Sequence, residues 1–338
     1  MSELPAGHFL RRPTQEDLAA VNDLMNACHL ADVGYPDSTV EDLAADWALP
    51  HFDLARDAWL VLGPDRNFVA YAWVWDKKPH VDMIADLYVH PRLRGHAIET
   101  ALLERIEDRA REHVPSAPDG EEVGVGLFAP AIGSGLGALL PGRGYDRIRT
   151  YFRMKIDLAG GYPGPGWPAG IVARAYRPGI DERTAHAVIE ESFAGNFRFI
   201  AEPHDEWIGR RVGYANFDPA LWLIAWDGDE AAGAILTYNF PDLGWVRELG
   251  VRPRWRGRGI GKALLLETFR SFEKRGQTRV CLGVDAANET GATILYERSG
   301  MRVETAHDLY QLTLRPATPA WGGASSLTPG PRLRRPTR

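Results

Sequence analysis

The residues best suited to chemistry in this chain form a glycine-rich turn at positions 256–262, with the sequence RGRGIGK. The glycines at 257, 259 and 261 carry no side chain, so successive backbone N–H groups can point outward at the start of a helix. Exposed N–H groups at a helix N-terminus bind phosphate or pyrophosphate. Arg256 and Arg258 add guanidinium groups that can hold phosphate oxygens through paired hydrogen bonds. The turn is therefore expected to bind a phosphate-bearing ligand.

Two common nucleotide-binding motifs do not fit this turn. A P-loop requires glycine at 256 and serine or threonine at 263, where the chain has Arg256 and Ala263. The dinucleotide fingerprint requires glycine at 262 or 264, where the chain has Lys262 and Leu264. The ligand is therefore expected to belong to neither of these two nucleotide classes.

A second motif follows at residues 288–301, with the sequence NETGATILYERSGM. The turn, preceded by LGV at 249–251, and this second segment together resemble the acetyl-CoA-binding signature of the GNAT N-acetyltransferase superfamily. Met301 stands where the superfamily usually has phenylalanine. The resemblance covers residues 171–315 well and residues 8–156 as a degraded copy. Such a tandem arrangement is also similar to that of the mycothiol synthases within the superfamily.

The resemblance implies direct transfer of an acetyl group from acetyl-CoA, used as a cosubstrate without a metal, to a small-molecule amine. Tyr296 would be the general acid that protonates the departing sulfur. The backbone N–H of Leu249 would polarise the acetyl carbonyl. The implied acetyl-CoA site comprises Leu249, Gly250, Val251, Arg256, Gly257, Arg258, Gly259, Ile260, Gly261, Lys262, Asn288 and Tyr296.

The general base is assigned to Glu248, acting directly or through water. Superfamily members often carry a glutamate near the start of the strand at 245–251, including the position where this chain has Trp245. Glu248 is the nearest carboxylate to that place, and Asp86 occupies the same position in the first copy. A carboxylate present in both copies also fits a shared structural role. His204 is a weaker candidate for the base.

The amine would enter beside the loop at 193–207, which the resemblance places next to the acceptor pocket. This loop combines aromatic residues with Glu202, Asp205 and Glu206, and such a surface attracts a cationic amine. An ordinary exposed loop fits the same residues.

These residues must be positioned by a plan that occurs twice in the chain. The segment VHPRLRG at 89–95 recurs as VRPRWRG at 251–257, an offset of 162 residues. Each copy predicts two helices, a strand hairpin, a strand, a helix, a strand, a helix and a strand. In the second copy the predicted helices span 181–193, 259–274 and 290–298, and the predicted strands span 245–251, 278–284 and 309–314. The fold class is therefore α/β with a mixed sheet, in two tandem GNAT-like domains.

The predicted domain boundaries follow from composition. Residues 1–156 form the degenerate domain, the glycine- and proline-rich residues 157–170 form the linker, and residues 171–315 form the catalytic domain. Residues 316–338 are predicted to be a flexible tail. The four arginines at its end also fit a nucleic-acid-binding arm.

The two copies differ where the chemistry is expected. Ala97 and Glu99 align with Gly259 and Gly261, and a carboxylate at this helix start would occupy the anion site itself. Leu140 aligns with Tyr296 and has no proton to donate. The first copy is therefore expected to be structural, and CoA binding without catalysis is its alternative.

Overall composition limits the class of protein. The 39 basic and 45 acidic residues among 338 give a net charge of −6, which argues against general nucleic-acid binding. Cys28 and Cys281 are too few for a disulfide framework or a metal cluster. No window has the roughly 18 apolar residues of a membrane span. We expect a cytoplasmic monomer whose two domains pack together.

Two other functions remain open at this point. The chain could be an acyl-CoA-binding regulatory protein without turnover, although such a protein needs no proton donor at position 296. It could also acetylate a lysine of a peptide or protein.

Overall fold

The computed structural model describes residues 2–318 except residues 96, 159, 163 and 289. The predicted tail at 316–338, including its four arginines, therefore lies almost entirely outside the described residues. Within the described part, no helix is long and apolar enough to cross a membrane.

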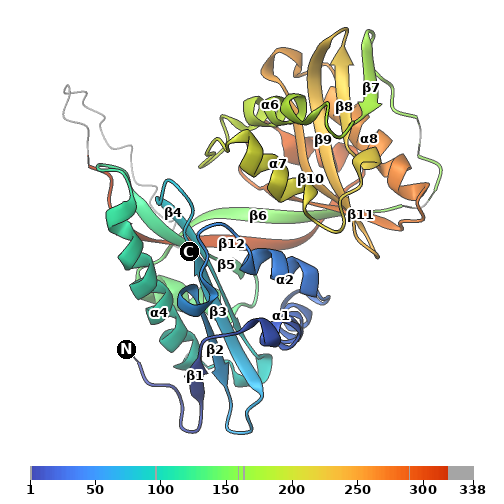
Figure 1. The fold of residues 1–338 in the computed structure, drawn as a ribbon. Coiled ribbons are helices and arrows are strands. Elements are labelled where there is room, and N and C mark those ends of the chain that lie inside the picture. The colour runs from blue at the N-terminus through green and yellow to red at the C-terminus, as the bar shows by residue number, and fades with distance from the viewer. Residues whose placement is uncertain (1, 96, 159, 163, 289, 319–338) are drawn as a thin grey trace, which may run out of the picture.

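The described residues form one mixed sheet with helices on both faces (Figure 1). The strands are β1 (Phe9–Arg11), β2 (Ala58–Leu62), β3 (Phe68–Trp75), β4 (Asp82–Val89), β5 (Val123–Pro130), β6 (Asp146–Asp157), β7 (Ile171–Ala175), β8 (Leu223–Asp227), β9 (Glu230–Asn239), β10 (Gly244–Val251), β11 (Arg279–Asp285) and β12 (Arg302–Arg315). The helices are α1 (Leu18–Val33), α2 (Val40–Trp47), α3 (Leu54–Asp57), α4 (Ala97–His113), α5 (Gly135–Leu139), α6 (Glu182–Phe193), α7 (His204–Val212), α8 (Ile260–Glu273) and α9 (Ala292–Arg298). The predicted α/β class with a mixed sheet is confirmed.

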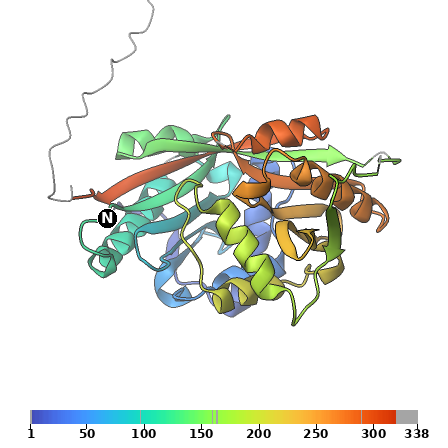
Figure 2. The same ribbon diagram turned by 90° about the horizontal axis from the view of Figure 1, so that it is seen from above.

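The strand order shows that the two halves exchange their closing strands. We call residues 2–157 the N-terminal half and residues 171–318 the C-terminal half. The order is β1-β2-β3-β4-β5-β12-β6-β11-β10-β9-β8-β7. Strand β12 of the C-terminal half pairs with β5, and β6 of the N-terminal half pairs with β11. Figure 2 shows β6 and β12 side by side at the centre, each extending into the other half.

Each half buries apolar side chains on both faces of the sheet. In the N-terminal half, Trp59 and Val61 pack towards α4, whereas Ala58 and Leu60 pack towards α1 and α2. Successive side chains of a strand point to opposite faces, so a strand covered on both sides reads as a continuous apolar run. The sequence AWLVL of β2 has this character.

The local predictions agree with the structure except at the two edge strands and at the start of the closing strand β12. The predicted helices at 181–193, 259–274 and 290–298 correspond to α6, α8 and α9, each starting one or two residues later. Strands β1 and β7, which begin the two halves, were not predicted, because short edge strands carry little periodic signal. The closing strand is longer than predicted and begins at Arg302.

The strand exchange predicts that the C-terminal half does not fold without β6. A fragment of residues 171–318 leaves β11 with an unpaired edge and β12 with no neighbour. We expect this fragment to show no cooperative thermal unfolding transition, and the full chain to show a single transition by calorimetry. A fragment of residues 146–318, which regains β6, is the matched control and should unfold cooperatively. A stable, cooperative 171–318 fragment would contradict the structural role of β6.

Candidate functional site

The candidate site lies where β10 and β11 separate. The two strands pair in parallel only between residues 244–246 and 280–282. Strand β10 then has a bulge between Val246 and Glu248 and continues in register with β9 alone. The backbone of residues 249–251 is thereby opened towards β11. An added Cβ at Gly250 would lie 2.8 Å from the Ser192 side chain, so glycine here lets α6 pack directly against β10.

The glycine-rich turn has the geometry that an anion site requires. Gly257 and Gly259 have φ values of 76° and 87°, in the left-handed region that favours glycine. Gly259 caps α8, and the side chain of Ile260 is buried in the core beneath the turn. No acceptor among the described residues receives the N–H groups of residues 257–262. These N–H groups at a helix N-terminus fit the pyrophosphate of a CoA molecule.

The two arginines of the turn already have partners within the protein. Arg256 donates from Nε to the carbonyl of Val251 at 3.1 Å and from a terminal nitrogen to the carbonyl of Ser192 at 2.8 Å. Arg94 makes the same Nε contact to Val89 in the first copy, at 3.2 Å. Arg258 is paired with Asp227 at 2.9 Å. Lys262 is exposed and has no ion pair among the described residues, which leaves its ammonium group available to phosphate.

Tyr296 lies on α9 and is 7% exposed, within the core that α8, β10 and β11 share. Its hydroxyl forms no hydrogen bond with a described residue. Burial raises the pKa of Tyr296 to about 12, so the hydroxyl keeps its proton at neutral pH. Such a group can act as a proton donor and cannot act as a base at this pH.

Asn288 lies in the turn between β11 and α9. Its side-chain oxygen accepts the backbone N–H of Thr290 at 2.9 Å, which shapes the approach to α9. The neighbouring residue Glu289 of the second motif lies outside the described residues.

Glu248 is held by a buried arginine that the sequence did not single out. Arg211 of α7 donates from Nε to one oxygen of Glu248 at 3.0 Å and from a terminal nitrogen to the other at 2.5 Å. The same guanidinium lies 3.2 Å from a carboxylate oxygen of Glu202 and 4.3 Å from the centre of the Trp207 ring. Burial alone would lower the pKa of Arg211, and the bonds and charges of Glu248 and Glu202 outweigh it and raise that pKa. Both oxygens of Glu248 are thus held in place by hydrogen bonds from one buried guanidinium.

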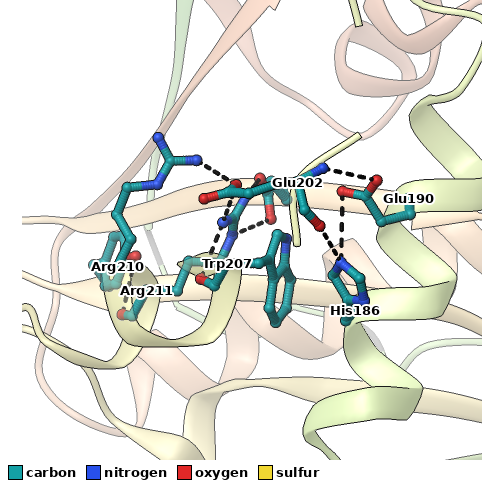
Figure 3. A network of polar contacts seen from close by, with 8 residues as sticks. His186, Glu190, Glu202, Trp207, Arg210 and Arg211 are labelled. Atoms are coloured by element: carbon teal, nitrogen blue, oxygen red, sulfur yellow. Dashed lines mark hydrogen bonds and ion pairs between the residues drawn. The ribbon is translucent and has the colours of Figure 1, made fainter. Parts of the chain in front are cut away.

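Part of the predicted acceptor loop makes structural contacts within the protein, and Asp205 and Glu206 remain exposed. Glu202 is paired with Arg210 at 2.5 Å in addition to Arg211, and its carbonyl accepts from His186 at 2.8 Å (Figure 3). His204 is hydrogen-bonded to Asp205 at 2.8 Å. The ring of Phe197 lies under the guanidinium of Arg149 from β6, at 4.1 Å.

Nearby, Arg198 pairs with Asp82 of the N-terminal half. The loop therefore helps to join the two halves.

Trp245 extends this inter-half contact on the other side of β10. The Arg153 guanidinium of β6 lies 5.1 Å from the Trp245 ring and 4.7 Å from the ring of Tyr35. Aromatic stacking thus replaces a carboxylate at this position. Within the described ranges, no group of three His, Cys, Asp or Glu side chains could hold a metal ion.

The equivalent turn of the first copy carries its own carboxylate. Glu99 is 5% exposed, and one of its oxygens accepts the N–H of Gly95 at 3.4 Å. The corresponding N–H in the second copy, that of Gly257, has no such acceptor. The side chain of Glu99 therefore stands where an anionic ligand would bind.

The comparisons with known proteins identify the family and the fold. The sequence profile of the Acetyltransferase (GNAT) family matches residues 18–120 and 186–301. A GCN5-related N-acetyltransferase from Sphaerobacter thermophilus is 35% identical, with a TM-score of 0.82 over 94% of this chain and 98% of that protein. A mycothiol acetyltransferase from Geodermatophilus obscurus is 29% identical over 89% of this chain and 96% of its own length. A tandem GNAT protein from the clavulanic acid biosynthesis pathway, 16% identical, shares the fold, with a TM-score of 0.69 over 92% of this chain and 100% of its own.

The turn geometry predicts that Gly261→Glu abolishes acetyl-CoA binding. An added Cβ at Gly261 lies 3.3 Å from Leu295 and 3.6 Å from Val251, so a side chain fits with a small adjustment. Its carboxylate would repel the pyrophosphate as Glu99 does in the first copy. We expect calorimetry to show one site per wild-type chain and an affinity at least about 100-fold lower in the variant.

Gly261→Ala is the matched control, because it adds the Cβ without a charge. Two equivalent sites on the wild-type chain would show that the turn of the first copy also binds acetyl-CoA.

Proposed function

Since the chain belongs to the GNAT family of N-acetyltransferases, we propose that its C-terminal half transfers an acetyl group from acetyl-CoA to a small-molecule amine. The observation that carries this proposal is the combination, in one half, of free N–H groups at the start of α8 with the buried hydroxyl of Tyr296. The other half has Glu99 and Leu140 at the equivalent positions. The names of the mycothiol acetyltransferase relatives support a small-molecule acceptor.

The residues of the C-terminal half have separate tasks in this reaction. Acetyl-CoA supplies an acetyl thioester that an uncharged amine can attack. The N–H groups of residues 257–262 and the ammonium of Lys262 hold the phosphates. The backbone at 249–251 orients the acetyl end, and the N–H of Leu249 stabilises negative charge on the carbonyl oxygen. The Tyr296 hydroxyl holds the proton that the departing sulfur needs.

Glu248 is proposed to accept the amine proton through water. The two hydrogen bonds from Arg211 hold this carboxylate in a fixed position. Because both oxygens of Glu248 already accept hydrogen bonds from Arg211, its contribution as a base is expected to be small.

Tyr296→Phe is expected to lower kcat by roughly 10²–10⁴-fold, because it removes the general acid. Acetyl-CoA affinity and the melting temperature should change little, since the phenylalanine ring keeps the packing and the lost hydroxyl has no hydrogen-bond partner among the described residues. Steady-state kinetics with a saturating amine, together with calorimetry, measure the two effects. An unchanged kcat would remove Tyr296 from the mechanism.

Glu248→Gln is expected to reduce kcat at neutral pH by about tenfold, less than the roughly 10²-fold usual for a general base. The rate should recover partly as pH rises, because free amine accumulates without help from the protein. The glutamine still offers an oxygen to Arg211, which also keeps Glu202, so the thermal shift should be small. A pH–rate profile measured beside a melting curve makes the comparison.

Asp86→Asn is the matched control in the first copy. Burial raises the pKa of Asp86 to about 6, above the ordinary value near 4, so the folded protein binds this proton more tightly than the unfolded chain does. Stability therefore falls as pH rises from about 4 to about 6 and stays lower above that range. We expect Asp86→Asn to raise the melting temperature at pH 8, to leave it unchanged at pH 4, and to leave kcat unchanged. Equal thermal effects of both amide variants, with kcat preserved in each, would exclude Glu248 as the base.

A further inference from the structure

The N-terminal half contains a cavity at the place that corresponds to the candidate site. Strands β4 and β5 pair between residues 82–85 and 124–127 and then separate, as β10 and β11 do. The space between them is a cavity of about 160 Å³. Its walls come from α1, the ends of β4 and β5, the start of α4 and the start of α5, and His307 of β12 adds a wall from the C-terminal half.

The charge of this cavity is negative. Its lining includes the carboxylates of Asp32, Asp86 and Glu99 and one guanidinium, that of Arg94. The guanidinium of Arg94 is paired with the carboxylate of Asp32, with N–O distances of 2.5 and 2.9 Å. Neither Asp86 nor Glu99 has an ion pair with any described residue.

The other titratable groups around the cavity are neutral at pH 7 or add negative charge. Burial lowers the pKa of His29 and of His307, so both rings are mostly uncharged. Burial raises the pKa of Cys28 to about 11, and its thiol donates a hydrogen bond to the carbonyl of Val89 at 3.3 Å. Two effects raise the pKa of Asp46 of α2 to about 7: burial, which is the larger, and the charge of Asp86.

Two buried polar atoms of the lining have no hydrogen-bond partner among the described residues. One is Oε2 of Glu99, whose side chain is more than nine-tenths buried, and the other is Nδ1 of His29. A buried carboxylate oxygen without a partner is costly, and a positively charged donor would remove that cost. The other oxygen of Glu99 already accepts the Gly95 N–H, so a pyrophosphate at this turn would meet a carboxylate.

We propose that the cavity of the N-terminal half binds a small organic cation with an ammonium group, held by the carboxylates of Asp86 and Glu99. A cavity of about 150 Å³ holds a molecule the size of benzene, so about six non-hydrogen atoms fit here. The N-terminal half would thus bind a cation at the place that corresponds to the proposed anion site of the C-terminal half. Because His307 belongs to β12, an occupied cavity adds a contact between the two halves and stabilises the whole chain.

Putrescine, which is of this size and carries ammonium groups, is the probe, and 1,4-butanediol is its uncharged counterpart. With the full chain at pH 7.5, calorimetry should show one putrescine site and a raised melting temperature, and the diol should show neither. Binding should weaken by at least about tenfold in Glu99→Gln and in Asp86→Asn. Asp108→Asn removes a charge from the exposed face of the same helix α4 and should leave binding unchanged.

A further variant and a pH series keep the test decisive if Glu99→Gln fails to fold. Gly135→Met should block binding without changing the charge, because a Cβ there meets no atom within 4 Å and Gly135 lines the cavity. Binding should also weaken from pH 7.5 to pH 5, as Asp86, whose pKa is about 6, takes up a proton. Absence of putrescine binding, binding that the Asp86, Glu99 and Gly135 variants leave unchanged, or displacement of putrescine by acetyl-CoA would overturn the proposal.

Discussion

The exchange of β6 and β12 between the halves is the constraint on which the rest of the structure depends. Strand β11, one wall of the candidate site, is paired along its whole length with β6 of the other half. Strand β5 is paired along its whole length with β12 in the same way. An unpaired strand edge inside the sheet would expose a row of N–H and C=O groups. Deleting either half would therefore remove a paired strand from the sheet of the other half. This explains why the first copy keeps the fold although its turn lacks the glycines at 259 and 261 of the second copy.

Local motifs predicted the parts of the site that are contiguous in sequence. The glycine-rich turn, the strand before it and the helix with Tyr296 each depend on residues close together in the chain, and all lie in one half around one core. The strand exchange could not be predicted, because a closing strand offers the same pattern of side chains to its own half and to the other. The choice between them depends on pairing over the whole sheet.

The sequence also did not predict which side chains far apart in the chain would pair with each other. Arg211 and Glu248 are 37 residues apart, on a helix and a strand with no shared periodicity. Arg256 is predicted to contact phosphate, and the structure adds a structural task, its hydrogen bonds to the carbonyls of Val251 and Ser192. The repeat indicated this structural task. Arg94 stands at the equivalent position in the first copy, where Glu99 occupies the predicted anion site and no phosphate ligand is expected.

Under the two proposals made above, the contrast between Gly261 and Glu99 is a case in which one residue reverses the preference of a site for charge without altering the fold. The stability of each half comes from apolar cores on both faces of the sheet, and neither position contributes to them. Two unit charges about 4 Å apart interact by about 4 kcal/mol at the effective dielectric of a protein surface. A single hydrogen bond contributes about 1 kcal/mol net, so several N–H groups are needed to equal one opposing carboxylate. A carboxylate at the helix start therefore outweighs much of the anion affinity of the turn, and the backbone frame common to both halves can serve ligands of opposite charge.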